Sequence, residues 1–189
     1  MSRGTRGLVI GLLIGAVALG AMVLRGDRGH EVATVGQAAV EAFRDGKFER
    51  FRPFTPAGLS PENRLRLMCG DGDIQASCQT RFDKAMKMAA KEEARFRAAF
   101  DESVAQAVAA GFDWTDAVLV SVDESGVTAT PPRIDSGVAA SGRLMVHGRS
   151  PAGGGFVLEL TGCAKITWQG WLCAIPRWHA EEKTKDVMQ

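Results

Sequence analysis

The sequence predicts an α+β protein in which an N-terminal transmembrane helix is followed by helices packed on a curved antiparallel sheet of four to five strands. Three observations support this prediction. Residues 7–24 form an apolar run without a charge. Apolar residues then recur every three or four positions as far as Gly111, a pattern typical of helices. After Asp113 the spacing changes to two, which is typical of strands with one buried face.

The apolar run at residues 7–24 indicates a membrane segment or a secretion signal. As a helix it would be roughly 27 Å long, close to the thickness of a hydrocarbon core. Arg3 and Arg6 precede it and Arg25 follows it. This small excess of positive charge on the N-terminal side favours an amino terminus in the cytoplasm. A signal cleaved near residues 16–18 is the alternative. A retained anchor is preferred because the apolar character continues beyond that site.

A retained anchor divides the chain into a short cytoplasmic stub, a membrane helix, a tether, one extracytoplasmic domain and a polar tail. The corresponding ranges are 1–6, 7–24, 25–30, 31–180 and 181–189. The expected location is a bacterial inner membrane, crossed once, with the domain in the periplasm.

Three glycines recur at every fourth position of the apolar run, at Gly7, Gly11 and Gly15. On a helix they share one face, where a second helix could approach closely. Small residues are also common in apolar helices that have no specific partner, so both interpretations stay open.

The overall charge is nearly neutral, with 23 basic and 22 acidic side chains. Such a balance lacks the electrostatic footprint of a protein that binds nucleic acid or an acidic lipid surface, so no nucleic-acid partner is expected. No cofactor is expected either.

The four cysteines form two close pairs along the chain, which in an oxidising compartment indicates disulfides. Three connectivities are open, and the short loops favour Cys69 with Cys78 and Cys163 with Cys173. A zinc site is the alternative, but the spacings differ from those of zinc knuckles and ribbons. Asp71 and Asp73, between the first two cysteines, invite a calcium interpretation, but later carboxylates are missing at the required spacing. A surface turn is preferred.

Helices are expected in the first half of the domain. The first begins at Glu31 and stops at Asp45-Gly46, and a short one follows at residues 47–51. Ser60 is the expected N-cap of the next helix, with Pro61 at its first position. The longest helix is expected to begin at Thr80, with Asp83 as a weak capping box, and to end at Gly111. Its apolar face would comprise Phe82, Met86, Ala89, Phe96, Phe100, Val104 and Val108.

One position interrupts this apolar face, because Glu93 stands where an apolar residue is expected. In a water-poor cavity its pKa would rise, and Glu93 could act as a general acid or base. The preferred alternative is that Glu93 lies at the edge of the face and pairs with a basic side chain such as Arg97. Glu93 is therefore a weak candidate for a catalytic residue.

Strands are expected in the second half, joined by turns so short that neighbouring strands must be antiparallel. The first has Val118, Val120 and Val122 on its buried face. The pattern predicts a meander with strands at residues 118–123, 127–130, 137–149, 156–168 and 171–178.

Candidate residues for a pocket are Phe96, Phe100, His147 and Trp171. His147 lies on a predicted strand and faces either the pocket or water, whereas His30 and His179 lie in polar segments. The four tryptophans, Trp114, Trp168, Trp171 and Trp178, could form a ligand platform, although core packing is the simpler interpretation.

Two segments resemble the NTF2-like family of cone-shaped α+β domains. Residues 35–55, VGQAAVEAFRDGKFERFRPFT, are similar to its opening helix, Asp-Gly turn and second aromatic helix. Residues 166–178, ITWQGWLCAIPRW, resemble its closing hairpin. The resemblance implies a curved sheet around the long helix, with a pocket in the cone. It also implies several functions, because the family includes isomerases, dehydratases, binding modules and membrane-anchored components of envelope assemblies.

The sequence departs from the enzymatic members of that family. The chain has no tyrosine, and no Asp-His or Tyr-Asp set on neighbouring strands can be carried over. We therefore expect a non-catalytic module that acts in an envelope or membrane-protein complex, with the bilayer and a protein partner or second copy as its contacts. A small-molecule ligand or an enzymatic reaction in the cone is the alternative, and a toxin-neutralising protein also fits the size and disulfides.

Overall fold

The computed structural model describes residues 31–70, 75–130 and 137–180. Its helices are α2 (Val32–Asp45), α3 (Phe48–Phe51), the 3-10 turns η1 (Arg52–Phe54) and η2 (Pro56–Gly58), α4 (Pro61–Cys69) and α5 (Ala76–Ala109). Its strands are β1 (Val118–Asp123), β2 (Val127–Ala129), β3 (Val138–Ser150), β4 (Gly154–Ile166), β5 (Gly170–Leu172) and β6 (Pro176–Ala180). The α+β class is confirmed.

The six strands form one curled antiparallel sheet with the shape of a half-barrel. The sheet is four strands wide, because β1 and β2 share one edge and β5 and β6 share the other. The long strands β3 and β4 pair with each other in the centre. On one side β1 and then β2 pair with successive parts of β3. On the other side β5 and β6 pair with opposite halves of β4. The antiparallel arrangement was predicted correctly. The simple meander was wrong, because β1 and β2 pair with β3 and not with each other.

The last predicted strand, residues 171–178, is divided into two strands, so the sheet has more strands than expected. Opposite the division, β4 changes register near Gly162, which has a left-handed φ of 57°. The Cys173 amide turns away from the sheet and donates to the Phe54 carbonyl oxygen at 2.8 Å. The strand resumes at Pro176, which pairs with Leu160. This break depends on a contact with a distant helical turn and has no signature in local spacing.

Local signals set the ends of the first helices as expected. Helix α2 ends at Gly46, whose φ of 61° is readily adopted by glycine. The Ser60 hydroxyl oxygen accepts a hydrogen bond from the Asn63 amide at 3.1 Å, so Ser60 caps α4.

Helix α5 begins at Ala76 and not at the predicted Thr80. Thr80 is therefore a residue of the first turns of α5 and not its N-cap, and its hydroxyl donates to the Ala76 carbonyl oxygen at 3.0 Å. Asp83 accepts a hydrogen bond from the Gln79 side chain and forms no capping box. The predicted start was one turn late, because the chain enters the helix at Gln75, which makes no side-chain cap.

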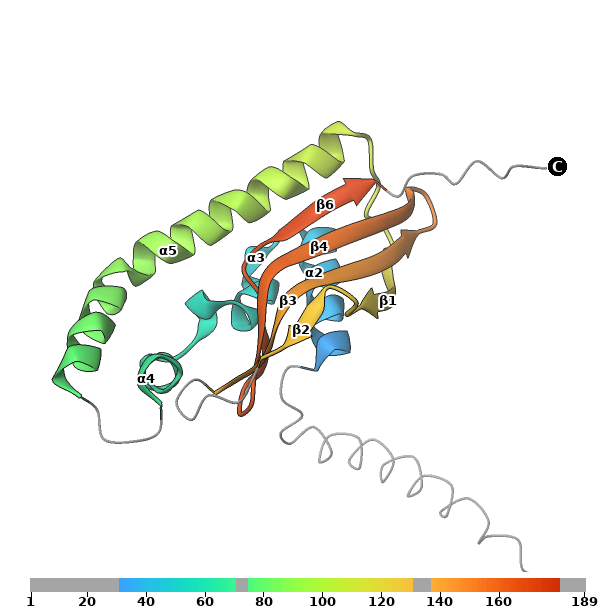
Figure 1. The fold of residues 1–189 in the computed structure, drawn as a ribbon. Coiled ribbons are helices and arrows are strands. Elements are labelled where there is room, and N and C mark those ends of the chain that lie inside the picture. Colours follow the sequence, from blue (N-terminus) through green and yellow to red (C-terminus); the bar gives the residue numbers. More distant parts are fainter. Residues whose placement is uncertain (1–30, 71–74, 131–136, 181–189) are drawn as a thin grey trace, which may run out of the picture.

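The hydrophobic core lies on the concave side of the sheet. Helices α2 and α3 lie behind the strands in Figure 1, and α5 runs along β6. The Phe43 and Phe100 rings join α2 to α5, with their centroids 5.1 Å apart. The strands and helices contribute fully buried side chains to this core: Val35, Ala39, Val40, Phe43, Phe51, Phe100, Leu144, Val146, Phe156, Leu158 and Leu160.

Only the C-terminal half of α5 belongs to this core. Phe100, Ser103 and Ala107 are buried there, whereas Val108, predicted for the apolar face, is 61% exposed. The buried face of α5 therefore passes through Ser103 and Ala107 and not through Val108. The N-terminal half extends past the strands and packs beside α4 (Figure 1).

Strand β1 also departs from the predicted pattern. The valines Val118 and Val120 are 54% and 63% exposed, and Leu119 and Val122 are the residues that pack on the core. The register shifts between Leu119 and Ser121. This bulge breaks the alternation on which the prediction relied.

No helix within the described residues is long and apolar enough to cross a membrane. The predicted anchor at residues 7–24, with Gly7, Gly11 and Gly15, lies outside the described residues, as do Asp71, Asp73 and the tail at residues 181–189.

Candidate functional site

Glu93, the candidate acid or base, lies on α5 opposite η1. Its two carboxylate oxygens accept hydrogen bonds from Nε and Nη2 of Arg52 at 2.9 and 3.0 Å. Arg97 is a more distant partner, with 3.8 Å between Nη2 and Oε1. The main partner is thus 41 positions away in the sequence, which helical spacing could not indicate. The preferred interpretation, an ion-paired Glu93, is the one that the geometry supports.

The electrostatic environment keeps Glu93 ionised. The hydrogen bonds from Arg52 hold the pKa of the Glu93 carboxyl below its usual value, and the charges of Arg52 and Arg97 act in the same direction. These effects outweigh the partial burial, which would raise the pKa. A general acid at neutral pH needs a raised pKa. The geometry of Glu93 is therefore that of a structural ion pair.

Three of the four pocket candidates belong to or pack against the hydrophobic core, and the fourth lies on the other face of the sheet. Phe100 is fully buried in the core and Phe96 packs partly against it. His147 lies on β3, in register with Ser121 and Val157. Its side chain is on the face of the sheet opposite to that of the buried Leu144 and Val146. Trp171, in the middle of β5, is buried in the same core. The structure therefore places three of these residues in or against the packed core and His147 on the opposite face of the sheet.

A groove with a volume of about 800 Å³ lies at the Trp171 end of the sheet. It is bounded by the first residues of α2, the start of β3 and the turn between β4 and β5. Its apolar lining comprises Val32, Ala139, Ile166, Trp168 and Trp171. The volume is within the range of pockets that hold small organic ligands.

Trp168 and Trp171 are the residues of this groove that the sequence had singled out, as parts of a ligand platform. The Arg66 guanidinium lies 4.6 Å from the centre of the Trp168 ring, so a cation already covers that ring. Glu31, Glu124 and Lys165 provide charges at the groove. This lining suits a flat, largely apolar ligand better than a strongly charged one.

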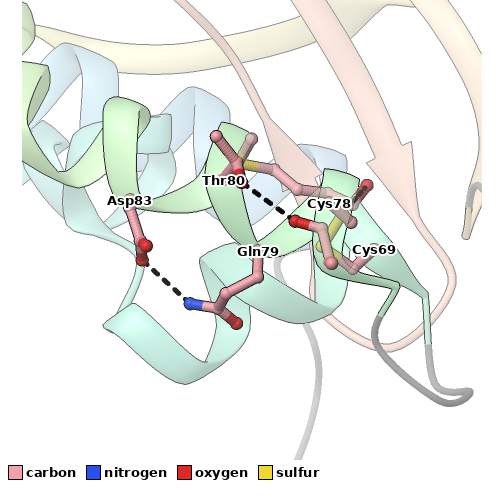
Figure 2. Close-up of a disulfide and its surroundings, with 7 residues drawn as sticks. Cys69, Cys78, Gln79, Thr80 and Asp83 are labelled. Atoms are coloured by element: carbon pink, nitrogen blue, oxygen red, sulfur yellow. Dashed lines mark hydrogen bonds between the residues drawn. A yellow bond between two sulfur atoms is a disulfide. The ribbon is translucent and has the colours of Figure 1, made fainter.

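Both predicted disulfides are present. Cys69 and Cys78 join the end of α4 to the first turn of α5, with a Cα–Cα distance of 5.9 Å (Figure 2). Cys163 and Cys173 join β4 to the segment between β5 and β6. The second disulfide is buried beside the bend of the sheet, whereas Cys69 is partly exposed. The first bridge thus connects α4 to the N-terminal part of α5, and the second holds the segment between β5 and β6 against β4.

A metal centre is not formed by the described part of the chain, in which no three His, Cys, Asp or Glu side chains are placed to hold an ion. The histidine His179 instead contacts Glu159, with 3.1 Å between Nε2 and Oε2. The same carboxylate accepts a hydrogen bond from Arg143 at 3.1 Å.

Comparisons of the chain with protein-family models, curated proteins and solved structures found no match.

Proposed function

We propose that the protein is a non-catalytic, membrane-anchored module that acts outside the cytoplasm in an envelope or membrane-protein complex, through contacts with protein partners. The observation that carries this proposal is the ion pair of Glu93 with Arg52. It argues against Glu93 as a general acid, because both of its carboxylate oxygens accept hydrogen bonds from Arg52 and its pKa is lowered.

The proposed location outside the cytoplasm is supported by two features of the chain. Residues 7–24 have the length and composition of a membrane helix. Both disulfides join cysteines of the domain that follows, and disulfides persist in oxidising compartments. Together they support a domain held on the outer side of a bacterial inner membrane. The curled sheet with a long helix along it is compatible with an NTF2-like cone, which we include in the proposal.

Strand β1 offers a surface for a protein contact. It is an edge strand of the sheet, and Val118 and Val120 are its exposed apolar side chains. An exposed edge strand can pair with a strand of another chain, and apolar side chains favour such a contact. We place the contact of the module with its partner, or with a second copy, at this edge.

Site-specific photo-crosslinking tests this contact. A photoreactive amino acid at position 120, in the full chain in its native membranes, should give a discrete crosslinked product. The matched control is position 108, because Val108 and Val120 are 61% and 63% exposed and Val108 lies on α5. Products of the same mass from both positions, or none from position 120, would contradict the proposed contact surface.

Intact-mass measurement tests the retained anchor and the oxidising compartment. Protein extracted from membranes should retain residues 7–24, and thiol alkylation without reduction should leave its mass unchanged. A chain that begins after residue 18 would exclude a retained anchor. Alkylation of all four cysteines would exclude an oxidising compartment.

A second candidate function is the binding of a small apolar ligand in the groove beside Trp168 and Trp171, and the groove volume favours it. Native mass spectrometry of protein purified without additives should then show a bound species. Trp168→Ala should release this species, whereas Trp178→Ala, which alters a tryptophan outside the groove, should retain it.

A further inference from the structure

The N-terminal half of α5 carries a one-sided row of positive charges. The row is formed by five exposed side chains, Arg81, Lys84, Lys87, Lys91 and Arg95. Their spacings of three and four residues place them within about one third of the helix circumference, since an α-helix turns by about 100° per residue. From the first to the last, the row is roughly 21 Å long at 1.5 Å per residue. We call these five residues the basic row.

The acidic side chains of this part of α5 do not neutralise the basic row. Glu92 pairs with Arg64 at 2.8 Å and Glu93 with Arg52 at 2.9 Å, both directed toward the body of the domain. Asp83 accepts a hydrogen bond from the neutral Gln79 side chain, so its charge remains and offsets one of the five positive charges. Within residues 31–70, 75–130 and 137–180, none of the five basic side chains forms an ion pair. The row therefore presents an unbalanced positive potential to its surroundings.

The position of the basic row makes it accessible. This half of α5 extends beyond the strands, and α4 covers it on one side (Figure 1). The ion pairs of Arg52 and Arg64 and the Cys69–Cys78 disulfide hold it to the body from that side. The opposite side, which carries the row, is exposed. The helix thus presents its charges on a supported and nearly linear scaffold.

The chemistry of the row selects an extended anionic surface as its partner. All five side chains of the row end in an amine or a guanidinium group on a flexible chain, and such groups bind phosphate oxygens without a shaped pocket. Met88 is the large exposed apolar residue beside them. No aromatic side chain of the row is available to stack on nucleic-acid bases, because the row consists of arginine and lysine alone.

We propose that the basic row binds the anionic phospholipid headgroups of the membrane next to the domain. The choice of a lipid surface over other polyanions rests on the proposed anchor. The tether at residues 25–30 could separate Glu31 from the membrane helix by at most roughly 20 Å, even when fully extended. A bilayer therefore lies within a short distance of the domain, and contact with the row would fix the orientation of the domain on its surface.

Lysine footprinting on the full chain in lipid bilayers tests this proposal. The probes are bilayers of phosphatidylcholine alone and of phosphatidylcholine with phosphatidylglycerol. We expect acetylation of Lys84, Lys87 and Lys91 to slow about threefold or more when phosphatidylglycerol is present, and the protection to be lost in high salt, because salt screens exposed charges. Lys47, which is exposed outside the row, should react at the same rate in both bilayers.

A charge-matched pair of variants separates a local effect of the row from an effect of net charge. In bilayers that contain phosphatidylglycerol at low salt, residues 80–91 of the wild type should exchange amide hydrogens more slowly than in phosphatidylcholine alone, and Lys84→Gln/Lys87→Gln/Lys91→Gln should abolish this difference. Lys47→Gln/Arg149→Gln/Arg177→Gln removes the same charge from other exposed positions and should keep the difference that the wild type shows. Glutamine is a good helix former, so the first variant should keep α5 intact, which circular dichroism would verify.

The outcomes distinguish this inference from the proposed function. Failure of the full chain to remain with phosphatidylcholine bilayers after a carbonate wash would refute the anchor, while flotation that depends on phosphatidylglycerol would still support the basic row. Equal acetylation rates in the two bilayers would overturn the inference while leaving the anchor intact. Stronger protection of the three lysines by single-stranded RNA than by phosphatidylglycerol bilayers at the same salt would also overturn it.

Discussion

At the scale of single residues, the pair formed by Glu93 and Arg52 determines how Glu93 should respond to pH. The hydrogen bonds of Arg52 hold the pKa of the Glu93 carboxyl below its usual value. The ionised carboxylate therefore stabilises the fold above the unfolded pKa, and this stabilisation is lost as the pH falls through the folded pKa. Since both side chains are partly exposed, the contribution should be only about 0.2–1 kcal/mol.

We predict that Glu93→Gln lowers the free energy of unfolding by this amount at neutral pH. The difference from the wild type should disappear under acidic conditions, below the folded pKa of Glu93. Urea unfolding at several pH values measures it. Glu102→Gln is the control on the same helix, because Glu102 is exposed and has no ion pair in the described structure. A larger difference at acidic pH than at neutral pH would contradict the assigned ion pair.

Gly148 is a second residue with a specific structural requirement. A Cβ atom at this position would lie 2.1 Å from Cζ of Phe156, a ring that is fully buried in the core. We predict that Gly148→Ala lowers the free energy of unfolding by about 1–3 kcal/mol through overpacking. Ser141→Ala, at an exposed position of the same strand, should have little effect.

A double variant identifies the cause of this loss. Phe156→Leu removes the atoms that the added methyl group would meet. Gly148→Ala should therefore destabilise the Phe156→Leu protein less than it destabilises the wild type, when all four proteins are compared by denaturant unfolding. Equal losses in the two backgrounds would show that the space beside Phe156 is not the reason for the glycine.

At the scale of the elements, the two disulfides perform different tasks. Cys163 and Cys173 are buried between β4 and the segment that leads to β6, whereas Cys69 is partly exposed at the end of α4. Each closes a short loop, for which the chain-entropy model gives a stabilisation of roughly 2.5 kcal/mol. Removal of the buried bridge should also leave a cavity.

We predict that Cys163→Ala/Cys173→Ala destabilises the protein more than Cys69→Ala/Cys78→Ala does. A mild reductant should open the Cys69–Cys78 bridge of the folded protein first, because Cys69 is partly exposed whereas both cysteines of the other bridge are buried. Differential alkylation followed by peptide mapping would show the order. Simultaneous reduction of both bridges under native conditions would contradict the assigned difference in access.

At the scale of the whole molecule, the described structure comprises a packed body and a helical extension. The sheet, α2 and the C-terminal half of α5 share the aromatic core. The N-terminal half of α5 is attached through α4, two ion pairs and one disulfide. Backbone amides with fewer buried contacts open at a lower free energy.

We predict that amides of residues 80–91 exchange hydrogen faster than those of residues 96–107. Cys69→Ala/Cys78→Ala should accelerate exchange in the first group and leave the second unchanged. Hydrogen-exchange mass spectrometry resolves the two groups within one helix. Uniform protection along α5 would show that the extension is part of the same cooperative unit as the core.

Local sequence signals were sufficient where the physical cause is itself local. The αL glycine at the end of α2, the cap at Ser60 and the disulfides within short loops were all predicted correctly. The change of apolar spacing after Asp113 separated helices from strands, because side chains on a helix and on a strand repeat with different periods.

The candidate site was predicted less well, since its residues depend on distant partners. Nothing near Glu93 in the sequence indicates Arg52, and Trp168 and Trp171 line a groove while His147 lies on the opposite face of the sheet from the core. Periodicity states that a side chain lies on one of two faces but does not state what covers that face. The exposed Val118 and Val120 illustrate this limit, because one bulge reversed their expected burial.

The sequence by itself determined the class of the domain and the order of its helices and strands, and it favoured the observed pairing of its cysteines among three, because turn residues, periodicity and short loops act over a few neighbours. Only the tertiary structure decided the division of the last strand, the partner of Glu93, and the separation of α5 into a buried half and an exposed basic half. These properties arise from contacts between residues that are far apart in the chain, and the energy of such contacts depends on the position of both partners.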